Sequence, residues 1–536
     1  MPRARSLAPV LLALTLIVLL LLARDTRAAR IVLAALPIAF VLVLMIGLHW
    51  GGHQAGPAGL LAGLLIAALA FGLSLDVLWV SQAKGVLIAL FVLAILWPAL
   101  LLYNVVNQVG GITAIAHALE AWIVERGILL IVVAWAFSGM LEGLAGFGLP
   151  VAIISPILVG MGVAPVTAVA AVAVGHAWSV TFGDMGVIYQ TLTGLVEVDN
   201  TRLASESALL LGAACLACGL AAARILGLGR RWPAVIALAV IMSAVQYALV
   251  VGGLVPLGAL GAGFAGIVGG AVISRPYARR AGAVHNGSPA RVLTPALASA
   301  LLSYGALTVL LTAIVLIGPL NDALRAVGWQ PAFAAVITRD GFETPAGTGQ
   351  ALRPLVHPGS AILLVALLSY AACRQRGLLP AQSWRSIAQA TQRSALPASI
   401  GVVAMVGLST LMEHTGMTQL LAEALSDALD RAFPLVSPVV GILGAFATGS
   451  NNNSNVLFAP LQESVAELLS IAPALLVAAQ TTGGSIGSML APAKIMVGSS
   501  TVGLHGRDGE VLRITLPYGL LIGLSIGLLT LALAQV

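Results

Sequence analysis

The chain has 536 residues, of which 59% are hydrophobic and 9% are charged, and its mean hydropathy is +1.03. Soluble domains carry about 25% charged residues, so this composition excludes a soluble fold. The apolar runs are continuous over about 20 residues and do not alternate, which predicts transmembrane helices and excludes a β-barrel. The net charge of +6 comes from basic residues in short loops, as membrane topology requires, so it does not indicate a nucleic-acid partner.

Predicted spans follow one another along the chain, with two interruptions. The first run, 7–23, begins like a signal peptide but has no small-residue cleavage site, so we interpret it as a retained helix. Two longer apolar regions, 128–182 and 431–492, are broken by Gly, Pro and Asn, and each predicts a re-entrant hairpin followed by a discontinuous helix. The simple spans are predicted at 7–23, 31–48, 57–73, 86–106, 206–226, 232–250, 254–273, 295–318, 359–373, 394–412 and 514–535.

Several other segments are not expected to carry chemistry. The amphipathic segments 112–126 and 414–430 are predicted to lie as surface helices beside the hairpins. The loop 339–349 is glycine-rich but lacks the ending of a phosphate loop and a flanking strand, so nucleotide binding is not predicted. Cys215 and Cys218 lie within an apolar helix and are interpreted as packing residues. No metal-ligand spacing or catalytic arrangement is found, so neither a metal, a cofactor nor an enzyme activity is predicted.

The two interrupted regions repeat one order of features about 300 residues apart. Gly111 and Gly416 open matching amphipathic segments, and a glycine-rich island, a proline and a polar break follow in each half. This predicts an all-α polytopic membrane protein of two inverted repeats, each with a re-entrant hairpin and a discontinuous helix. The predicted divisions are N-terminal transmembrane helices at 1–50, repeat 1 at 51–200, connecting transmembrane helices at 201–349, repeat 2 at 350–505 and a C-terminal transmembrane helix at 506–536.

Basic loops indicate the orientation, because cytoplasmic loops are enriched in Lys and Arg. If each hairpin enters and leaves on one face, loop 74–85 lies outside and loop 373–393 lies inside, so the repeats are inverted. The segment 24–30, with three arginines, then lies outside against the rule, and the orientation of the N-terminus stays open. The arginine clusters predicted on the cytoplasmic side are 224–231, 275–291 and 374–393.

The first polar island, Leu141–Pro150, places Glu142 among glycines in an apolar region. Polar groups at membrane depth are costly, and two islands in corresponding halves point to a transporter binding site. Glu142 is expected either to cap the amides of 143–148 or to act as a protonatable site, since burial disfavours the charged carboxylate. Gly146 and Gly148 permit a sharp turn whose exposed amides attract anions.

The second island, 448–455, offers neutral amide and hydroxyl donors that can bind a carboxylate; the alternative is a tip that satisfies its own polar groups. Two later polar breaks, 175–184 and 480–488, are expected to face the islands. His176 is either a packing residue bonded within its helix or part of a proton relay. Asp184 is either a coupling carboxylate or a group at the helix mouth.

Lys494 follows the second break and either snorkels to the interface or reaches the substrate carboxylate.

Residues 141–153, Leu-Glu-Gly-Leu-Ala-Gly-Phe-Gly-Leu-Pro-Val-Ala-Ile, closely resemble the signature of the bacterial L-lactate permease family. The resemblance implies an inner-membrane secondary carrier of lactate, glycolate and related 2-hydroxy monocarboxylates, driven by proton symport. It also implies kinship with the ion-transporter superfamily, whose members use paired hairpins and broken helices. The chain departs from the family pattern at 176–179, at 451–453 and at Lys494, where an uncharged polar residue is usual. Further matching segments are 158–162, 180–183, 232–235, 448–450, 454–458, 481–484 and 509–513.

We therefore expect a monomeric or homodimeric symporter in the bilayer of the bacterial inner membrane, importing a small organic anion of the 2-hydroxy monocarboxylate class with a proton. The alternative is a sodium-coupled carrier of a dicarboxylate or sulfonate, because Ser/Asn-rich loops also coordinate sodium. A membrane enzyme using His176 and Asp184, or a passive channel, are weaker alternatives. Proton coupling is assigned to Glu142, His176 and Asp184. Substrate binding is assigned to Gly146, Gly148, Ser179, Ser450, Asn451, Asn452, Asn453, Ser454, Asn455, Thr481, Thr482, Gly483 and Lys494.

Overall fold

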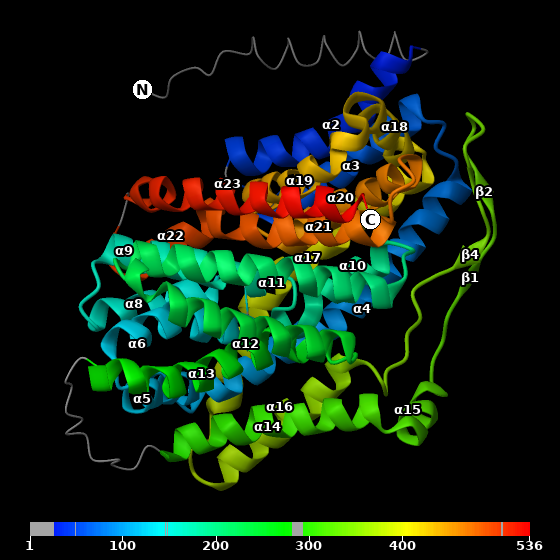
Figure 1. The fold of residues 1–536 in the computed structure, drawn as a ribbon. Helices are drawn as coiled ribbons and strands as arrows, with labels where there is room; N and C mark the ends of the chain where they lie inside the picture. Colours follow the sequence, from blue (N-terminus) through cyan, green and yellow to red (C-terminus); the bar gives the residue numbers. More distant parts are fainter. Residues whose placement is uncertain are drawn as a thin grey trace, which may run out of the picture.

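The computed structural model describes residues 26–48, 50–144, 146, 148–280, 293–504 and 507–535. Within these ranges, 12 helices are long and apolar enough to cross a membrane. Figure 1 shows the long helices side by side along one common axis. The predicted all-α polytopic fold is confirmed, whereas the predicted helix at 7–23 lies outside the described residues.

Simple helices form where the apolar sequence is uninterrupted, and polar side chains cap several of their first turns. The Ser74 hydroxyl accepts a hydrogen bond from the Val77 amide, and the Thr294 hydroxyl accepts one from the Leu297 amide. The simple helices are α2 (Arg27–Gly47), α3 (Gly52–Ala70), α4 (Leu75–Gln108), α11 (Asn200–Ile225), α12 (Trp232–Val251), α13 (Gly258–Arg280), α14 (Pro295–Leu316), α16 (Pro358–Gln375), α17 (Ser383–His414) and α23 (Asp508–Leu533).

Both interrupted regions form two helices joined by a tight tip. The tips turn at Gly148 and Gly449, which have φ of +82° and +73°, a conformation that favours glycine. Hairpin 1 consists of α6 (Arg126–Val132), the π-helical turn η1 (Val133–Phe137), α7 (Ser138–Leu144) and α8 (Leu149–Gly160). Hairpin 2 consists of α19 (Phe433–Thr448) and α20 (Asn451–Leu468).

A broken helix follows each hairpin. Pro165 and Pro473 occupy the first helical position of each one, where a missing amide proton costs nothing. The first broken helix consists of α9 (Pro165–His176), η2 (Ala177–Ser179), η3 (Asp184–Gly186) and α10 (Val187–Leu195). The second consists of α21 (Pro473–Gly487), η7 (Ser488–Leu490) and α22 (Pro492–Thr501).

The open ends of the two hairpins lie at different ends of the bundle. At the start of hairpin 1, Glu125 accepts a hydrogen bond of 2.8 Å from Arg231, whose guanidinium lies over the Tyr277 ring. We call this the basic end, because the arginine clusters 224–231 and 374–393 lie there (left in Figure 1). Hairpin 2 starts at the opposite end, next to α18. The inverted relation of the complete repeats stays a prediction.

Short elements cover the end opposite the basic end. The helix α18 (Met417–Leu429) lies there, and Arg27 of α2 pairs with its Asp427 at 2.7 Å. Contrary to the expectation for loop 339–349, two strands lie within it: β3 pairs with β2 and β4 pairs with β1, as a narrow antiparallel ribbon (Figure 1). Backbone pairing across a turn needs no apolar alternation, so these two-residue strands left no sequence pattern. The other short elements at this end are α15 (Gly318–Arg325), β1 (Ala332–Phe333), β2 (Val336–Ile337), β3 (Glu343–Thr344) and β4 (Gly347–Thr348), whereas α5 (Gly111–Trp122) packs against α14 and α4 elsewhere (Figure 1).

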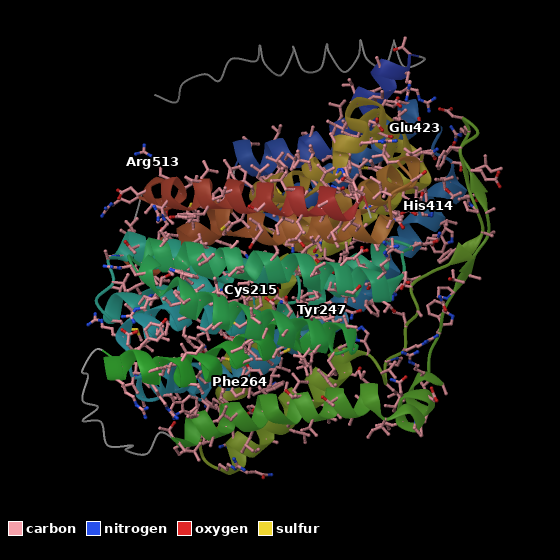
Figure 2. All side chains as sticks on the ribbon, in the orientation of Figure 1. Cys215, Tyr247, Phe264, His414, Glu423 and Arg513 are labelled. Atoms are coloured by element: carbon pink, nitrogen blue, oxygen red, sulfur yellow. The ribbon has the colours of Figure 1, made fainter. Side chains whose placement is uncertain are left out.

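The core lies around hairpin 1 and the broken helices. Trp135 and Trp178 are fully buried, and so is Cys215 of α11. Apolar side chains such as Phe264 point outward from the bundle (Figure 2). An apolar exterior is the surface that lipid requires, so the bundle presents its hydrophobic residues both inward and outward.

Candidate functional site

A cavity of about 320 Å³ lies where both hairpin tips approach the broken helices. Its polar wall comes from α7, from the break before α10, from the tip of hairpin 2 and from α22. Its other wall comes from α3, α4 and α17. The predicted site residues that line it are Glu142, Asp184, Ser450, Asn451, Asn452, Asn453 and Lys494.

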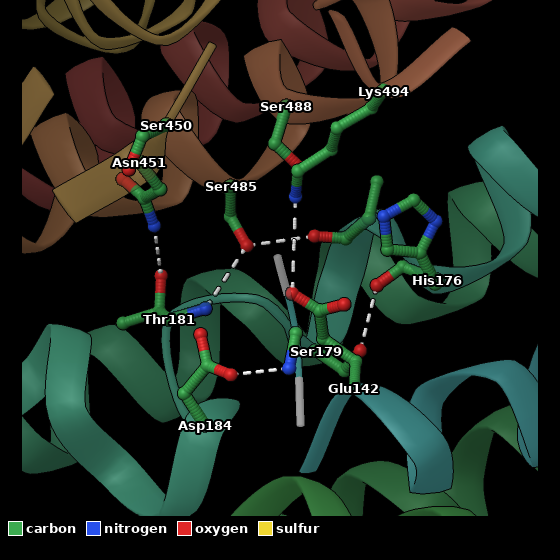
Figure 3. A network of polar contacts seen from close by, with 12 residues as sticks. Glu142, His176, Ser179, Thr181, Asp184, Ser450, Asn451, Ser485, Ser488 and Lys494 are labelled. Carbon is green, nitrogen blue, oxygen red and sulfur yellow. Dashed lines mark hydrogen bonds and ion pairs between the residues drawn. The ribbon is translucent and has the colours of Figure 1, made fainter. Parts of the chain in front are cut away.

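A buried charged group forms the centre of the polar wall. Lys494 Nζ lies 3.9 Å from Glu142 Oε1 and donates a hydrogen bond of 3.3 Å to Ser488 Oγ (Figure 3). The Glu142 side chain is 1% exposed and that of Lys494 10%. Neither Glu142 oxygen has a hydrogen-bond partner among the described residues. Lys494 therefore points into the site and does not snorkel to the interface.

Asp184 anchors the tip of hairpin 1. Its Oδ1 accepts a short hydrogen bond from the Gly146 amide (Figure 3). Asp184 and the following Met185 have φ of +50° and +55°, a strained backbone of the kind held at functional sites. The expected capping of amides 143–148 by Glu142 is therefore wrong for Gly146, because Asp184 occupies that amide.

Hydrogen bonds join the first broken helix both to hairpin 2 and to the second broken helix. Asn451 Nδ2 donates to Thr181 Oγ1 at 3.0 Å, and Thr181 Oγ1 donates to the Thr481 carbonyl at 3.1 Å. Ser485 Oγ donates to the Ala177 carbonyl at 2.7 Å (Figure 3). The two breaks thus face each other, and Thr181 and Ser485, absent from the predicted substrate-binding set, hold them together.

Other predicted residues support the frame behind the cavity. Ser179 Oγ donates to the His176 carbonyl, and Thr482 Oγ1 donates to the Ala478 carbonyl. A Cβ on Gly483 would lie 2.0 Å from the Pro438 carbonyl oxygen, so glycine is needed there for helix contact. Those predicted residues that do not line the cavity are Gly146, Gly148, Ser179, Ser454, Asn455, Thr481, Thr482, Gly483 and His176.

His176 is fully buried at the end of α9. Its Nδ1 lies 2.9 Å from the Val172 carbonyl, which makes Nδ1 the donor and leaves Nε2 as an acceptor in the neutral ring. Nε2 has no partner among the described residues. The histidine is therefore bonded within its helix, as one alternative expected, and it still presents a free acceptor.

The second wall of the cavity was missed by sequence reasoning. It includes Gly52 and His53 at the start of α3 and Ser394 on α17. Gly52 packs against Gly401, and small residues at helix contacts were the available signal. His53, Ser394 and Val497 are exposed, so the cavity opens between α3, α17 and α22, toward the basic end.

Comparison with known proteins identifies the family. The L-lactate permease family matches residues 30–536.

The chain belongs to the L-lactate permease family.

This family member is 27% identical to the L-lactate permease of Salmonella typhimurium, over 93% of this chain and 94% of that protein. It is 27% identical to the L-lactate permease of Bacillus subtilis, with the same coverage, and 26% identical to the glycolate permease GlcA of Escherichia coli, over 94% and 95%. Its structure is similar to that of the Alcanivorax borkumensis YdaH transporter, with a TM-score of 0.46 and 17% identity, over 82% of this chain and 84% of the other. With its candidate spans, this family member is a multi-pass protein of the bacterial inner membrane.

Proposed function

We propose that this family member imports a small 2-hydroxy monocarboxylate, such as lactate or glycolate, together with a proton. One observation carries the proposal: a buried lysine faces two buried carboxylates in a cavity between the hairpin tips. A cation at membrane depth needs an anionic partner, and a substrate carboxylate is a partner that Lys494 can bind besides Glu142. The permeases of lactate and glycolate named above are its relatives.

Lys494 is the proposed anchor for the substrate carboxylate. Ser450 and the amides of Asn451–Asn453 line the same cavity and supply neutral hydrogen-bond donors around the anion. A site that hydrogen-bonds a substrate hydroxyl discriminates strongly against analogues that lack it. We assign the substrate 2-hydroxyl to the side of the cavity that Ser450 and Asn451–Asn453 line, because these residues supply neutral hydrogen-bonding groups.

The carboxylates are the proposed sites of proton coupling. Glu142 and Asp184 both line the cavity, and both are buried. Moving one proton with one monoanion is electroneutral and avoids about 2.3 kcal/mol per net charge and 100 mV of membrane potential. His176, with its free Nε2, is the further candidate for passing the proton.

The proposed direction of access follows from the arginines. The basic end is assigned to the cytoplasm, because short cytoplasmic loops carry excess Lys and Arg. His53 and Ser394 are exposed on the side of the cavity toward the basic end, which supports the proposal that this conformation releases substrate into the cell.

A sodium-coupled carrier is the second candidate. The side-chain oxygens of Asn451, Asn452 and Asn455 are buried and have no hydrogen-bond partner among the described residues. Amide oxygens are ligands for hard cations, so this group favours sodium if the coupling ion is not a proton.

Uptake into proteoliposomes separates these candidates. Labelled lactate is supplied under an imposed pH gradient, with and without sodium, and with glycolate, pyruvate, succinate and sulfonates as competitors. The proposal expects accumulation driven by the pH gradient without sodium, and competition by glycolate. Accumulation that requires a sodium gradient would favour the second candidate. Equilibration without accumulation would contradict both.

A further inference from the structure

We infer that Lys494 exchanges between two anions, the Glu142 carboxylate in the empty cavity and the substrate carboxylate in the loaded one, so that substrate and proton bind together. This inference rests on the proposed function. It goes further by placing both binding events on one ion pair. Coupling then needs no signal between separate sites, because the single positive charge of Lys494 neutralises only one carboxylate charge at a time.

The geometry of the pair favours exchange. The distance of 3.9 Å between Lys494 Nζ and Glu142 Oε1 is longer than the roughly 2.7–2.9 Å of a charge-assisted hydrogen bond. The hydrogen-bond partner of Lys494 is instead the neutral hydroxyl of Ser488. The ammonium is thus held near Glu142 but is not locked to it, and an incoming carboxylate can compete.

Glu142 depends on Lys494 for its charge. It lies 1% exposed, and neither of its oxygens accepts a hydrogen bond from a described residue. A buried carboxylate without a donor is strongly unfavourable, and it becomes neutral when its counter-ion is removed. If a substrate carboxylate forms an ion pair with Lys494, Glu142 loses its counter-ion and must bind a proton.

Asp184 behaves differently, although it lines the same cavity. The amide of Gly146 donates to its carboxylate, so Asp184 has a hydrogen bond of its own that does not involve Lys494. Four titratable groups surround Glu142. They are Asp184 on η3, His176 on α9, Lys494 on α22 and His53 at the cavity mouth. Among them, Lys494 forms the ion pair.

The charges also balance. With both carboxylates ionised, Glu142, Asp184 and Lys494 carry one net negative charge. Binding of a monoanion alone would change the net charge of the cavity from −1 to −2. Binding of a monoanion together with a proton on Glu142 keeps the net charge at −1. The loaded and empty cavities then have the same charge, and by linkage the proton raises substrate affinity as much as substrate raises proton affinity.

The test measures lactate binding to purified full-length protein by calorimetry between pH 5.5 and 8.5, together with the protons taken up per lactate bound. The wild type should take up one proton per lactate, and its Kd should rise tenfold per pH unit in the upper part of the range. Glu142→Gln should bind lactate with a Kd that is independent of pH and should take up no proton. Lys494→Gln should weaken binding at least tenfold at every pH.

Matched variants control for the substitutions themselves. Glu206→Gln alters a carboxylate of α11 that pairs with Arg202 away from the cavity, and Lys84→Gln alters the other lysine of the chain. Both should keep the wild-type pH dependence. Thermal unfolding shows whether each variant is folded; if Glu142→Gln is not, Glu142→Met serves in its place and should also bind without proton uptake.

The outcomes distinguish the exchange at Lys494 from the proposed function. If the wild type accumulates lactate with protons but Glu142→Gln still takes up one proton per lactate, the exchange at Lys494 is wrong and the proposed function stands. Binding by Lys494→Gln at wild-type strength would overturn both the exchange and the assignment of Lys494 as the carboxylate anchor, whereas import of lactate with a proton would stand. If the wild type neither binds nor accumulates lactate or glycolate, the proposed function itself fails.

Discussion

The hydrogen bond between Asn451 and Thr181 should stabilise the contact between the two halves of the protein. Thr181→Val removes the acceptor of Asn451 Nδ2 and the donor to the Thr481 carbonyl. A lost hydrogen bond costs about 1 kcal/mol in proteins, and bonds between transmembrane helices average about 0.6 kcal/mol. We expect Thr181→Val to lower the free energy of unfolding by about 1–2 kcal/mol, and Asn451→Ala by about 1 kcal/mol.

A double-mutant cycle isolates the bond. Because both variants lose the same interaction, the double variant should be more stable than the sum of the single effects predicts, by about 0.5–1 kcal/mol. The assay is equilibrium unfolding in mixed micelles, followed by circular dichroism. Thr193→Val is the matched control, since the Thr193 hydroxyl donates to the Gln190 carbonyl within its own helix. Strict additivity of Thr181→Val and Asn451→Ala would refute this reasoning.

Three further predictions concern packing, access and pH. Gly483→Ala should sharply lower the melting temperature, because its Cβ would lie 2.0 Å from a backbone oxygen, whereas Gly160→Ala, with no atom within 4 Å, should leave it unchanged. Ser394→Cys should react with a membrane-impermeant maleimide that is added on the cytoplasmic side, and Asp340→Cys should react when the maleimide is added on the opposite side. Reaction of each variant from the other side would show that the proposed orientation is inverted. Burial lowers the pKa of His357 to about 4, below the model-peptide value of about 6.5. Between these two pH values the unfolded chain therefore binds more protons than the folded one, so the free energy of unfolding falls as pH drops from about 6.5 to 4. His357→Gln should reduce this fall. Thermal unfolding measured across this pH range checks the prediction.

Residue patterns predicted the helices and the polar islands for separate reasons. Helices begin after Ser, Asp or Thr caps, and lipid leaves a chain no alternative to the helix, so the span of α11 was predicted from the sequence. The predicted loop 74–85 is wrong, because α4 begins at Leu75, directly after its Ser74 cap. A carboxylate or a run of asparagines at membrane depth is costly, and this cost identified Glu142 and the segment 448–455 as candidate site residues. The ribbon of β1–β4 was not readable, because four two-residue strands produce no periodicity.

The hydrogen-bond partners of the site residues could not be predicted from the sequence. Nothing in the local sequence distinguishes Asp184, which binds the Gly146 amide, from Glu142, which does not. Likewise, Ser179 and Thr482 bond to carbonyls of their own helices, while Ser450 lines the cavity. Which hydroxyl faces the cavity depends on the rotation of each broken helix against its hairpin, and long-range contacts set that rotation.

By itself, the sequence determined that this protein spans the membrane many times and carries two glycine-bent polar regions, because both properties follow from the free energy of transferring local groups into lipid. Only the tertiary structure decided that Lys494 lies beside Glu142, and that His53 and Ser394 form the opposite wall. These residues are separated by hundreds of positions. Their proximity comes from the packing of whole helices, which no local pattern encodes.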